Sequence, residues 1–210
     1  SSSSSSSNST TTNTSTIEKD KMKNLLQQQQ CKEEKEEFKR GEGSKERQIK
    51  LAVILKSITK PCNCMNIIRS ADYFGASEVV IVGRDTLTAV KTLWGSHPIS
   101  VPIIRIESTL KKAITRLKAA GYKVFGIEIE ESSQPVSSLP FAHTHHTAFL
   151  AGAEWGLSKD AMSFCDGFVY ISQFGAGVPC INVGMASSIA LHYFAEWRNE
   201  NEKTRKIKDY

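Results

Sequence analysis

The sequence predicts an α/β domain whose core is a mainly parallel sheet with helices on both faces. Three features indicate this class. Short, continuous apolar runs recur from residue 51 onward, and segments with apolar residues at helical spacing lie between them. Clusters of glycine and polar residues follow several of the apolar runs, at the end of the strands where a parallel sheet carries its ligand sites.

Several apolar runs have the length and texture of strands. They are LAVIL (51–55), EVVIVG (78–83), VPIIRI (101–106), KVFGIEI (123–129), TAFLAG (147–152) and FVYIS (168–172). Most of these runs are apolar at successive positions, which is typical of strands that are buried on both faces. The run at 101–106 is weaker, and the missing N–H of Pro102 predicts an edge strand or the start of a strand.

The segments between these runs include predicted helices. They span residues 63–74, 108–121, 158–165 and 181–200. Ser108 and Ser158 are the candidate N-caps, because a hydroxyl at that position accepts a hydrogen bond from the first helical turn. Gly75 and Gly121 are placed to end their helices, since glycine readily adopts the left-handed conformation that follows a last turn.

Composition separates the ends of the chain from its centre. Residues 1–16 are almost entirely serine, threonine and asparagine, so they have nothing to bury and are predicted to form a disordered tail. Residues 17–47 are dense in Lys, Glu and Gln and predict a charged, partly helical extension and linker. An RNA-contacting arm is the alternative for this segment. Residues 48–200 hold all the predicted elements, and 201–210 form a polar tail.

Composition also limits the classes of function. The chain has 210 residues, is 40% hydrophobic and carries a net charge of +5, which permits a nucleic-acid partner without requiring one. It has no apolar run long enough to span a membrane. Its five cysteines are scattered and odd in number, which predicts reduced thiols in a soluble, intracellular protein. The compartment, whether cytoplasm, nucleus or organelle, stays open.

A metal site is the first candidate for the chemistry, because Cys62, Cys64 and the histidines of the HTHH segment at 143–146 are ligand types. The Cys-x-Cys spacing is tighter than that of structural zinc sites, and no second cysteine pair follows. The histidines lie in a Ser- and Pro-rich loop that is predicted to face solvent. We therefore predict no metal.

Nucleotide hydrolysis and serine catalysis are disfavoured as well. The glycine-bearing loops match neither the P-loop nor the dinucleotide fingerprint, and no G-x-S-x-G segment is present. Gly152 and Gly156 still bracket Glu154 directly after a strand, where the backbone must turn sharply or approach a ligand. Cys180 precedes a predicted helix start, a position at which reactive thiols are found, although burial as a small apolar residue is the commoner fate of free cysteine.

Arg69 and two asparagines remain as candidates. Arg69 and Asn63 follow the first strand, and Asn182 opens the last helix. An arginine near the carboxyl end of a strand is suited to hold a phosphate or to stabilise an alkoxide. On spacing alone, an ordinary surface arginine is the equal alternative.

Three motifs in order resemble those of the SpoU-type (TrmH-like) RNA ribose 2′-O-methyltransferases of the SPOUT superfamily. They are Pro61-x-Asn63 with Arg69-x-Ala71-x-x-Phe74-Gly75, FLAGAEWGLS at 149–158, and ISQFGAGVPCINVGMASSIAL at 171–191. The resemblance runs from about residue 48 to 198 and makes residues 48–200 a SpoU-type methyltransferase domain. It implies a C-terminal trefoil knot, which periodicity alone would not predict.

The resemblance also implies a reaction and its residues. S-adenosylmethionine would donate a methyl group to a ribose 2′-hydroxyl of tRNA or rRNA, in a homodimer to whose interface the last helix contributes. The implied catalytic residues are Arg69, Asn63, Asn182 and Cys180, and the implied cofactor-binding residues are Ile127, Gly152, Glu154, Gly156, Ile171 and Ile181. Arg69 is expected to stabilise charge and position the substrate phosphate, because a guanidinium is a reluctant base.

The chain departs from the family pattern at several positions in these motifs. Met65 stands where glycine is usual, Ala153 and Trp155 flank Glu154 in place of Asn and Gly, Cys180 and Ile181 replace Ser and Leu, and Gly184 replaces a further Ser. The alternative function is therefore a catalytically weak or inactive family member that binds RNA or a partner protein.

Overall fold

The computed structural model describes residues 49–93, 99–153, 155–175, 177 and 180–198. The predicted disordered tail (1–16), charged extension (17–47) and polar tail (201–210) lie outside these residues. Apart from Ala142–Thr144, the described residues belong to one compact unit that contains every helix and strand given below. Among the described helices, none is long and apolar enough to cross a membrane.

The unit is built on a seven-stranded sheet in the order β3-β2-β1-β6-β4-β7-β5. Its strands are β1 (Leu51–Lys56), β2 (Glu78–Val82), β3 (Ile103–Glu107), β4 (Tyr122–Ile127), β5 (Gln134–Pro135), β6 (His146–Ala151) and β7 (Gly167–Tyr170). Every strand pair in the described sheet is parallel. The predicted fold class and the six predicted strands are confirmed, including the edge position of the strand that follows Pro102.

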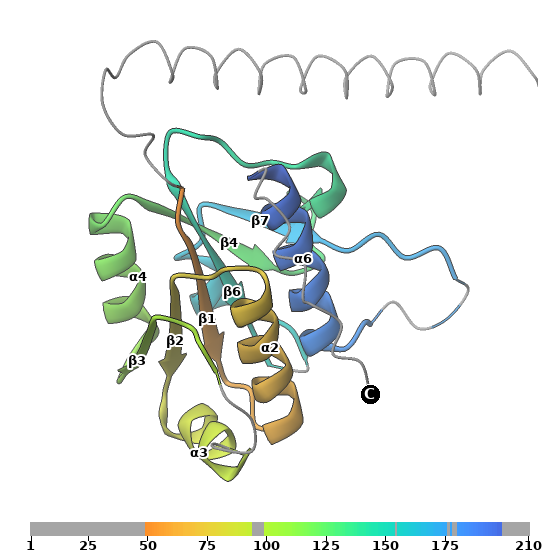
Figure 1. The fold of residues 1–210 in the computed structure, drawn as a ribbon. Helices are drawn as coiled ribbons and strands as arrows, with labels where there is room; N and C mark the ends of the chain where they lie inside the picture. Colours follow the sequence, from red (N-terminus) through yellow and green to blue (C-terminus); the bar gives the residue numbers. More distant parts are fainter. Residues whose placement is uncertain (1–48, 94–98, 154, 176, 178–179, 199–210) are drawn as a thin grey trace, which may run out of the picture. The chain divides into compact units, whose positions relative to one another are not determined.

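Helices cover both faces of the sheet (Figure 1). They are α2 (Pro61–Tyr73), α3 (Arg84–Leu93), α4 (Leu110–Ala119), α5 (Lys159–Met162), α6 (Val183–Trp197) and the 3₁₀ helix η1 (Val136–Ser138). Two neighbouring residues of β6 show which helix covers which face of the sheet, because successive side chains of a strand point to opposite faces. Leu150 packs in the buried cluster that includes Leu117 of α4. The Phe149 ring lies 6.1 Å from that of Phe194 in α6.

Helix α2 begins two residues before the predicted start and ends one residue before the predicted end. Pro61 occupies its first turn, where a missing N–H costs nothing. Gly75 follows its end with φ 69°, and the N–H of Ala76 donates to the carbonyl of Ala71 over 2.8 Å. This is the glycine-dependent closure that the sequence predicts.

The cap of α4 differs from the prediction. Thr109, not Ser108, is the N-cap, and its hydroxyl accepts the N–H of Lys112 at 3.3 Å. Thr109 holds the extended conformation directly before the first helical residue, so its hydroxyl reaches the free N–H groups of the first turn. Gly121 follows the helix with φ 83°, as predicted.

The remaining helices correct other boundaries. The segment predicted at 158–165 is helical only over Lys159–Met162, although Ser158 does cap it through the N–H of Ala161. The last helix begins at Val183 rather than at 181, because Asn182 is its cap. Helix α3 was not predicted.

Candidate functional site

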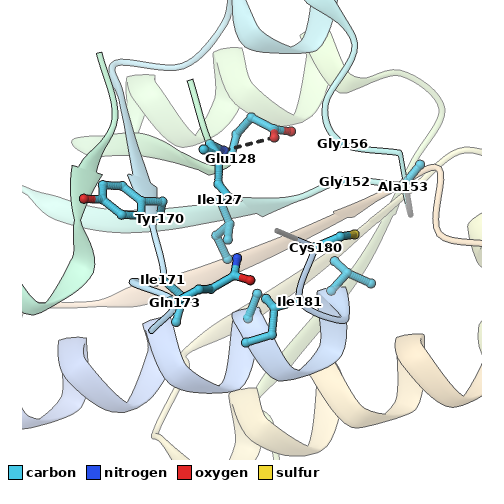
Figure 2. Close-up of a pocket in the computed structure, with 13 residues that line it drawn as sticks. Ile127, Glu128, Gly152, Ala153, Gly156, Tyr170, Ile171, Gln173, Cys180 and Ile181 are labelled. Carbon is cyan, nitrogen blue, oxygen red and sulfur yellow. Dashed lines mark hydrogen bonds between the residues drawn. The ribbon is translucent and has the colours of Figure 1, made fainter. Parts of the chain in front are cut away.

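A pocket opens where the carboxyl ends of β4, β6 and β7 meet the start of α6 (Figure 2). Its lining consists of Ile127, Glu128, Ile129, Gly152, Ala153, Gly156, Tyr170, Ile171, Gln173, Cys180, Ile181, Val183 and Ala186. Five of the six residues expected to bind the cofactor are in this lining, from four separate segments of the chain. The sixth, Glu154, lies outside the described residues. Their role in cofactor binding stays a prediction.

The wall that includes Gly152, Ala153 and Gly156 changes direction sharply and requires its glycines. The N–H of Gly156 donates to the carbonyl of Ala153 at 3.0 Å, and Gly156 has φ +87°. A Cβ at Gly156 would lie 2.6 Å from an Oε of Glu128, and one at Gly152 would lie 2.5 Å from Leu157 Cδ2. The sharp turn that these two glycines predict is present, and the approach of a ligand stays a prediction.

Glu128 holds this turn, and the sequence analysis did not identify it. One carboxylate oxygen accepts the N–H of Leu157 at 2.6 Å, and the other accepts the N–H of Ile129 at 3.0 Å. Its backbone N–H donates to the carbonyl of Val169, which ties the end of β4 to β7. The sequence feature that could have identified Glu128 is an acidic residue at the end of a buried strand, on the edge of the sheet that carries ligands.

Two of the predicted catalytic residues form a pair next to the pocket. The Asn182 Oδ1 accepts the N–H groups of Gly184 at 2.9 Å and Met185 at 3.4 Å, and so caps α6. Its Nδ2 donates to Oδ1 of Asn63, over 3.1 Å, on the first turn of α2. Asn63 is only 3% exposed. The pair therefore fixes the starts of α2 and α6 relative to each other.

Because Gly184 has no side chain, α2 and α6 can pack closely at this point. A Cβ there would lie 3.1 Å from Asn182 Oδ1 and 3.4 Å from the Cβ of Asn66. Further along the same helix pair, the hydroxyls of Ser70 and Ser188 are 2.6 Å apart. A larger side chain at position 184 would disturb the asparagine cap, so the departure from serine suits this packing.

The other two predicted catalytic residues differ in their relation to the pocket. Cys180 is exposed and belongs to the lining. Arg69 is half-buried on α2, about 9 Å along the helix axis from Asn63. It is not one of the described residues that line the pocket. Its catalytic role stays a prediction.

The cysteines of the first motif lie in different environments. Cys62 is exposed, whereas Cys64 is buried and its thiol lies 3.5 Å from the carbonyl oxygen of Ile58. Burial raises the pKa of the Cys64 thiol to about 11, so it stays protonated at neutral pH. Within the described residues, no three side chains of metal-ligating type are grouped to hold an ion.

These features define a class of protein. A parallel sheet with a glycine-bordered pocket beyond the carboxyl ends of its inner strands is the arrangement of α/β proteins that bind nucleotides and related cofactors. The sequence profile of the SpoU rRNA Methylase family matches residues 50–192. The chain belongs to this family.

Relatives with assigned activities agree with the family match. The tRNA (guanosine(18)-2′-O)-methyltransferase of Thermus thermophilus is 32% identical over 148 residues, which are 69% of this chain and 74% of that protein. The enzyme of the same name from Escherichia coli is 28% identical over 158 residues, or 74% of this chain and 66% of that protein.

A solved structure extends the similarity to the fold. The SpoU methyltransferase AviRb of Streptomyces viridochromogenes, in complex with the cofactor AdoMet, superposes with a TM-score of 0.58 at 28% identity. The match covers 75% of this chain and 61% of that one. The chain thus spans less than two thirds of the length of this structural relative.

Proposed function

We propose that this chain transfers a methyl group from S-adenosylmethionine to a ribose 2′-hydroxyl of tRNA or rRNA. The observation that carries the proposal is the pocket itself, which brings five predicted cofactor residues together in a SpoU-family fold. The relatives from Thermus thermophilus and Escherichia coli methylate a tRNA guanosine at the 2′-oxygen, according to their names. Their activity supports RNA as the substrate class.

The pocket residues fit the cofactor. The glycines at 152 and 156 let the backbone pack closely against Leu157 and Glu128, and both glycines line the pocket, where their backbone groups can contact the adenosine. Ile127, Ile171 and Ile181 supply apolar contacts for the nucleoside. The Glu128 carboxylate places negative charge in the wall of a pocket whose cofactor carries a positive sulfonium. Bound here, S-adenosylmethionine supplies an electrophilic methyl group.

Activation of the 2′-hydroxyl depends on protein side chains. A protonated 2′-hydroxyl is a poor nucleophile, so the site must stabilise the negative charge that develops on its oxygen. In our proposal, Arg69 stabilises this charge and positions the adjacent phosphate through its guanidinium, and that phosphate assists removal of the hydroxyl proton. Asn63 and Asn182 hold the starts of α2 and α6, from which Arg69 and the pocket lining project. This role makes the two asparagines positioning residues.

We further infer a homodimer in which α6 contributes to the interface, and an intracellular location. Met185 is an exposed apolar residue on the first turn of α6, and all described cysteines are free thiols. Sedimentation equilibrium of the full chain should give twice the monomer mass.

The trefoil knot also stays a prediction, because residues 176, 178 and 179 of the loop before α6 lie outside the described residues.

The activity is tested with S-adenosylmethionine that carries a tritiated methyl group. Incubation with unmodified tRNA and rRNA transcripts should label one RNA class. Alkaline hydrolysis of that RNA should leave the label in a dinucleotide, since a methylated 2′-oxygen cannot cleave the adjacent phosphodiester. Binding of the cofactor without any labelling would favour the non-catalytic alternative, and absence of both would reject the proposed activity.

Cofactor binding should also protect Cys180 from alkylation. Cys62 and Cys180 are exposed and should react with iodoacetamide at pH 8. Cys64 and Cys165 should not, because burial raises their thiol pKa values to about 11 and about 12. Saturating S-adenosylmethionine is expected to slow modification of Cys180 alone, measured by mass spectrometry of peptides. Equal slowing at Cys62, or none at Cys180, would contradict placement of the cofactor in this pocket.

A further inference from the structure

Exposed apolar residues occur in the segments of the chain that line the pocket. Of the seven large apolar residues that are exposed in the described part of the chain, three line the pocket or are next in sequence to a lining residue and lie outside α6. These are Ile129, Trp155 and Phe174. Trp155 and Phe174 are each 97% exposed. Such a concentration of exposed apolar surface marks a binding site for a partner.

Trp155 is held in place by the turn that carries it. The Ala153–Gly156 hydrogen bond closes the turn on either side of it. The N–H of Leu157 is bound by Glu128 at 2.6 Å, and the Leu157 side chain packs against the buried core on the α4 side of the sheet. The backbone N–H groups of the two residues after Trp155 are therefore hydrogen-bonded, while the indole ring itself is almost fully exposed. A positioned but uncovered aromatic ring is suited to stack on a planar ligand.

The proposed activity supplies such a ligand. A ribose that receives a methyl group must approach the mouth of this pocket, and it carries its nucleobase and adjoining nucleotides with it. Unpaired bases stack on aromatic side chains in RNA-binding proteins, because every base presents an aromatic face. We propose that Trp155 stacks on an unpaired nucleobase of the RNA substrate, at or next to the methylated nucleotide. This inference rests on the proposed function and adds that the site accepts RNA in which a base at or next to the methylated nucleotide is unpaired.

A second copy of the chain is the competing occupant of this surface. A copy seated on Trp155 would cover the turn that borders the pocket. It would thereby obstruct the approach of the ribose. The position of Trp155 at the edge of the pocket therefore favours RNA over a protein partner.

The test compares Trp155→Ala and Trp155→Phe with the wild type, and uses Ile106→Ala as the matched control. Ile106 is an exposed apolar residue on the edge strand β3, outside the pocket lining. The probes are an unmodified tRNA transcript and a blunt-ended RNA duplex of similar length. We expect Trp155→Ala to raise the Kd for the transcript roughly 5- to 100-fold. Trp155→Phe should stay close to the wild type, and Ile106→Ala should have no effect.

Tryptophan fluorescence gives an independent readout. Binding of the transcript should quench the wild-type emission, and Trp155→Phe should lose most of that quenching while it still binds. The inference is overturned if Trp155→Ala binds the transcript as the wild type does, or loses the same factor for the duplex. It is overturned equally if Trp155→Ala changes the oligomeric state while the Kd for RNA is unchanged.

These experiments distinguish failure of the stacking inference from failure of the proposed methyltransferase activity. Failure of that activity would appear as absence of cofactor binding and of methyl labelling in the wild type. Failure of the stacking inference would appear in variants of a protein that binds cofactor and labels RNA normally. Binding of S-adenosylmethionine by Trp155→Ala should match the wild type, which also shows that the turn remains folded.

Discussion

Replacing Arg69 with alanine is expected to slow methyl transfer to RNA by roughly 10²- to 10³-fold, the usual cost of removing one group that stabilises a developing oxyanion. Binding of S-adenosylmethionine should be almost unchanged, because Arg69 lies outside the lining of the pocket. Single-turnover labelling with saturating RNA measures the chemical step, and calorimetric titration measures cofactor binding.

Two further variants test whether the slower methyl transfer is specific to the guanidinium of Arg69. Arg84→Ala removes the same charge from an exposed site at the start of α3 and should leave transfer unaffected. Arg69→Lys keeps the charge but loses the planar pair of donors, so its rate should fall between those of alanine and the wild type. If Arg69→Ala weakened cofactor binding as much as it slowed transfer, a direct role in transition-state stabilisation would be contradicted.

Replacing Phe149 with alanine is expected to lower the free energy of unfolding by about 3–5 kcal/mol. Phe149 is fully buried in β6, and its ring lies 5.7 Å from that of Phe141 and 6.1 Å from that of Phe194. Truncation would leave a cavity between the sheet and α6 that these rings cannot fill without leaving their own contacts. A loss of this size is a large fraction of the roughly 5–15 kcal/mol that stabilises a typical domain.

Phe174→Ala is the matched control for stability, because it deletes the same atoms from a side chain that is 97% exposed. Its free energy of unfolding should change by less than about 0.5 kcal/mol. Urea denaturation followed by circular dichroism measures both variants. A loss below about 1 kcal/mol for Phe149→Ala would show that Phe149 does not anchor α6 on the sheet.

The sequence predicted the sheet well because the strands are buried on both faces. Runs such as LAVIL and EVVIV carry that signal locally, and Gly75 and Gly121 mark helix ends through a conformation that few other residues adopt. Helix α3 was missed because RDTLTAVKTL contains three threonines, which favour helices weakly. It is anchored by tertiary contact instead, since the buried Thr86 hydroxyl accepts the N–H of Ile58.

The site was predictable only in part. Resemblance to the family identified six of the thirteen residues that line the pocket, and two glycines showed by themselves that the backbone turns sharply. Glu128 was missed because Leu157, which its carboxylate binds, lies 29 residues away in the sequence. The contact between Asn63 and Asn182 spans 119 residues and depends on how α2 and α6 pack. Local patterns carry no information on such pairings.

We propose that the pocket at the ends of β4, β6 and β7 holds the methyl donor. A crystal structure of the protein with S-adenosylmethionine is the most direct test. We expect the adenosine to lie against Gly152, Gly156 and Ile181, with Glu128 still bound to the N–H of Leu157. Cofactor bound elsewhere on the chain, with this pocket empty, would contradict it.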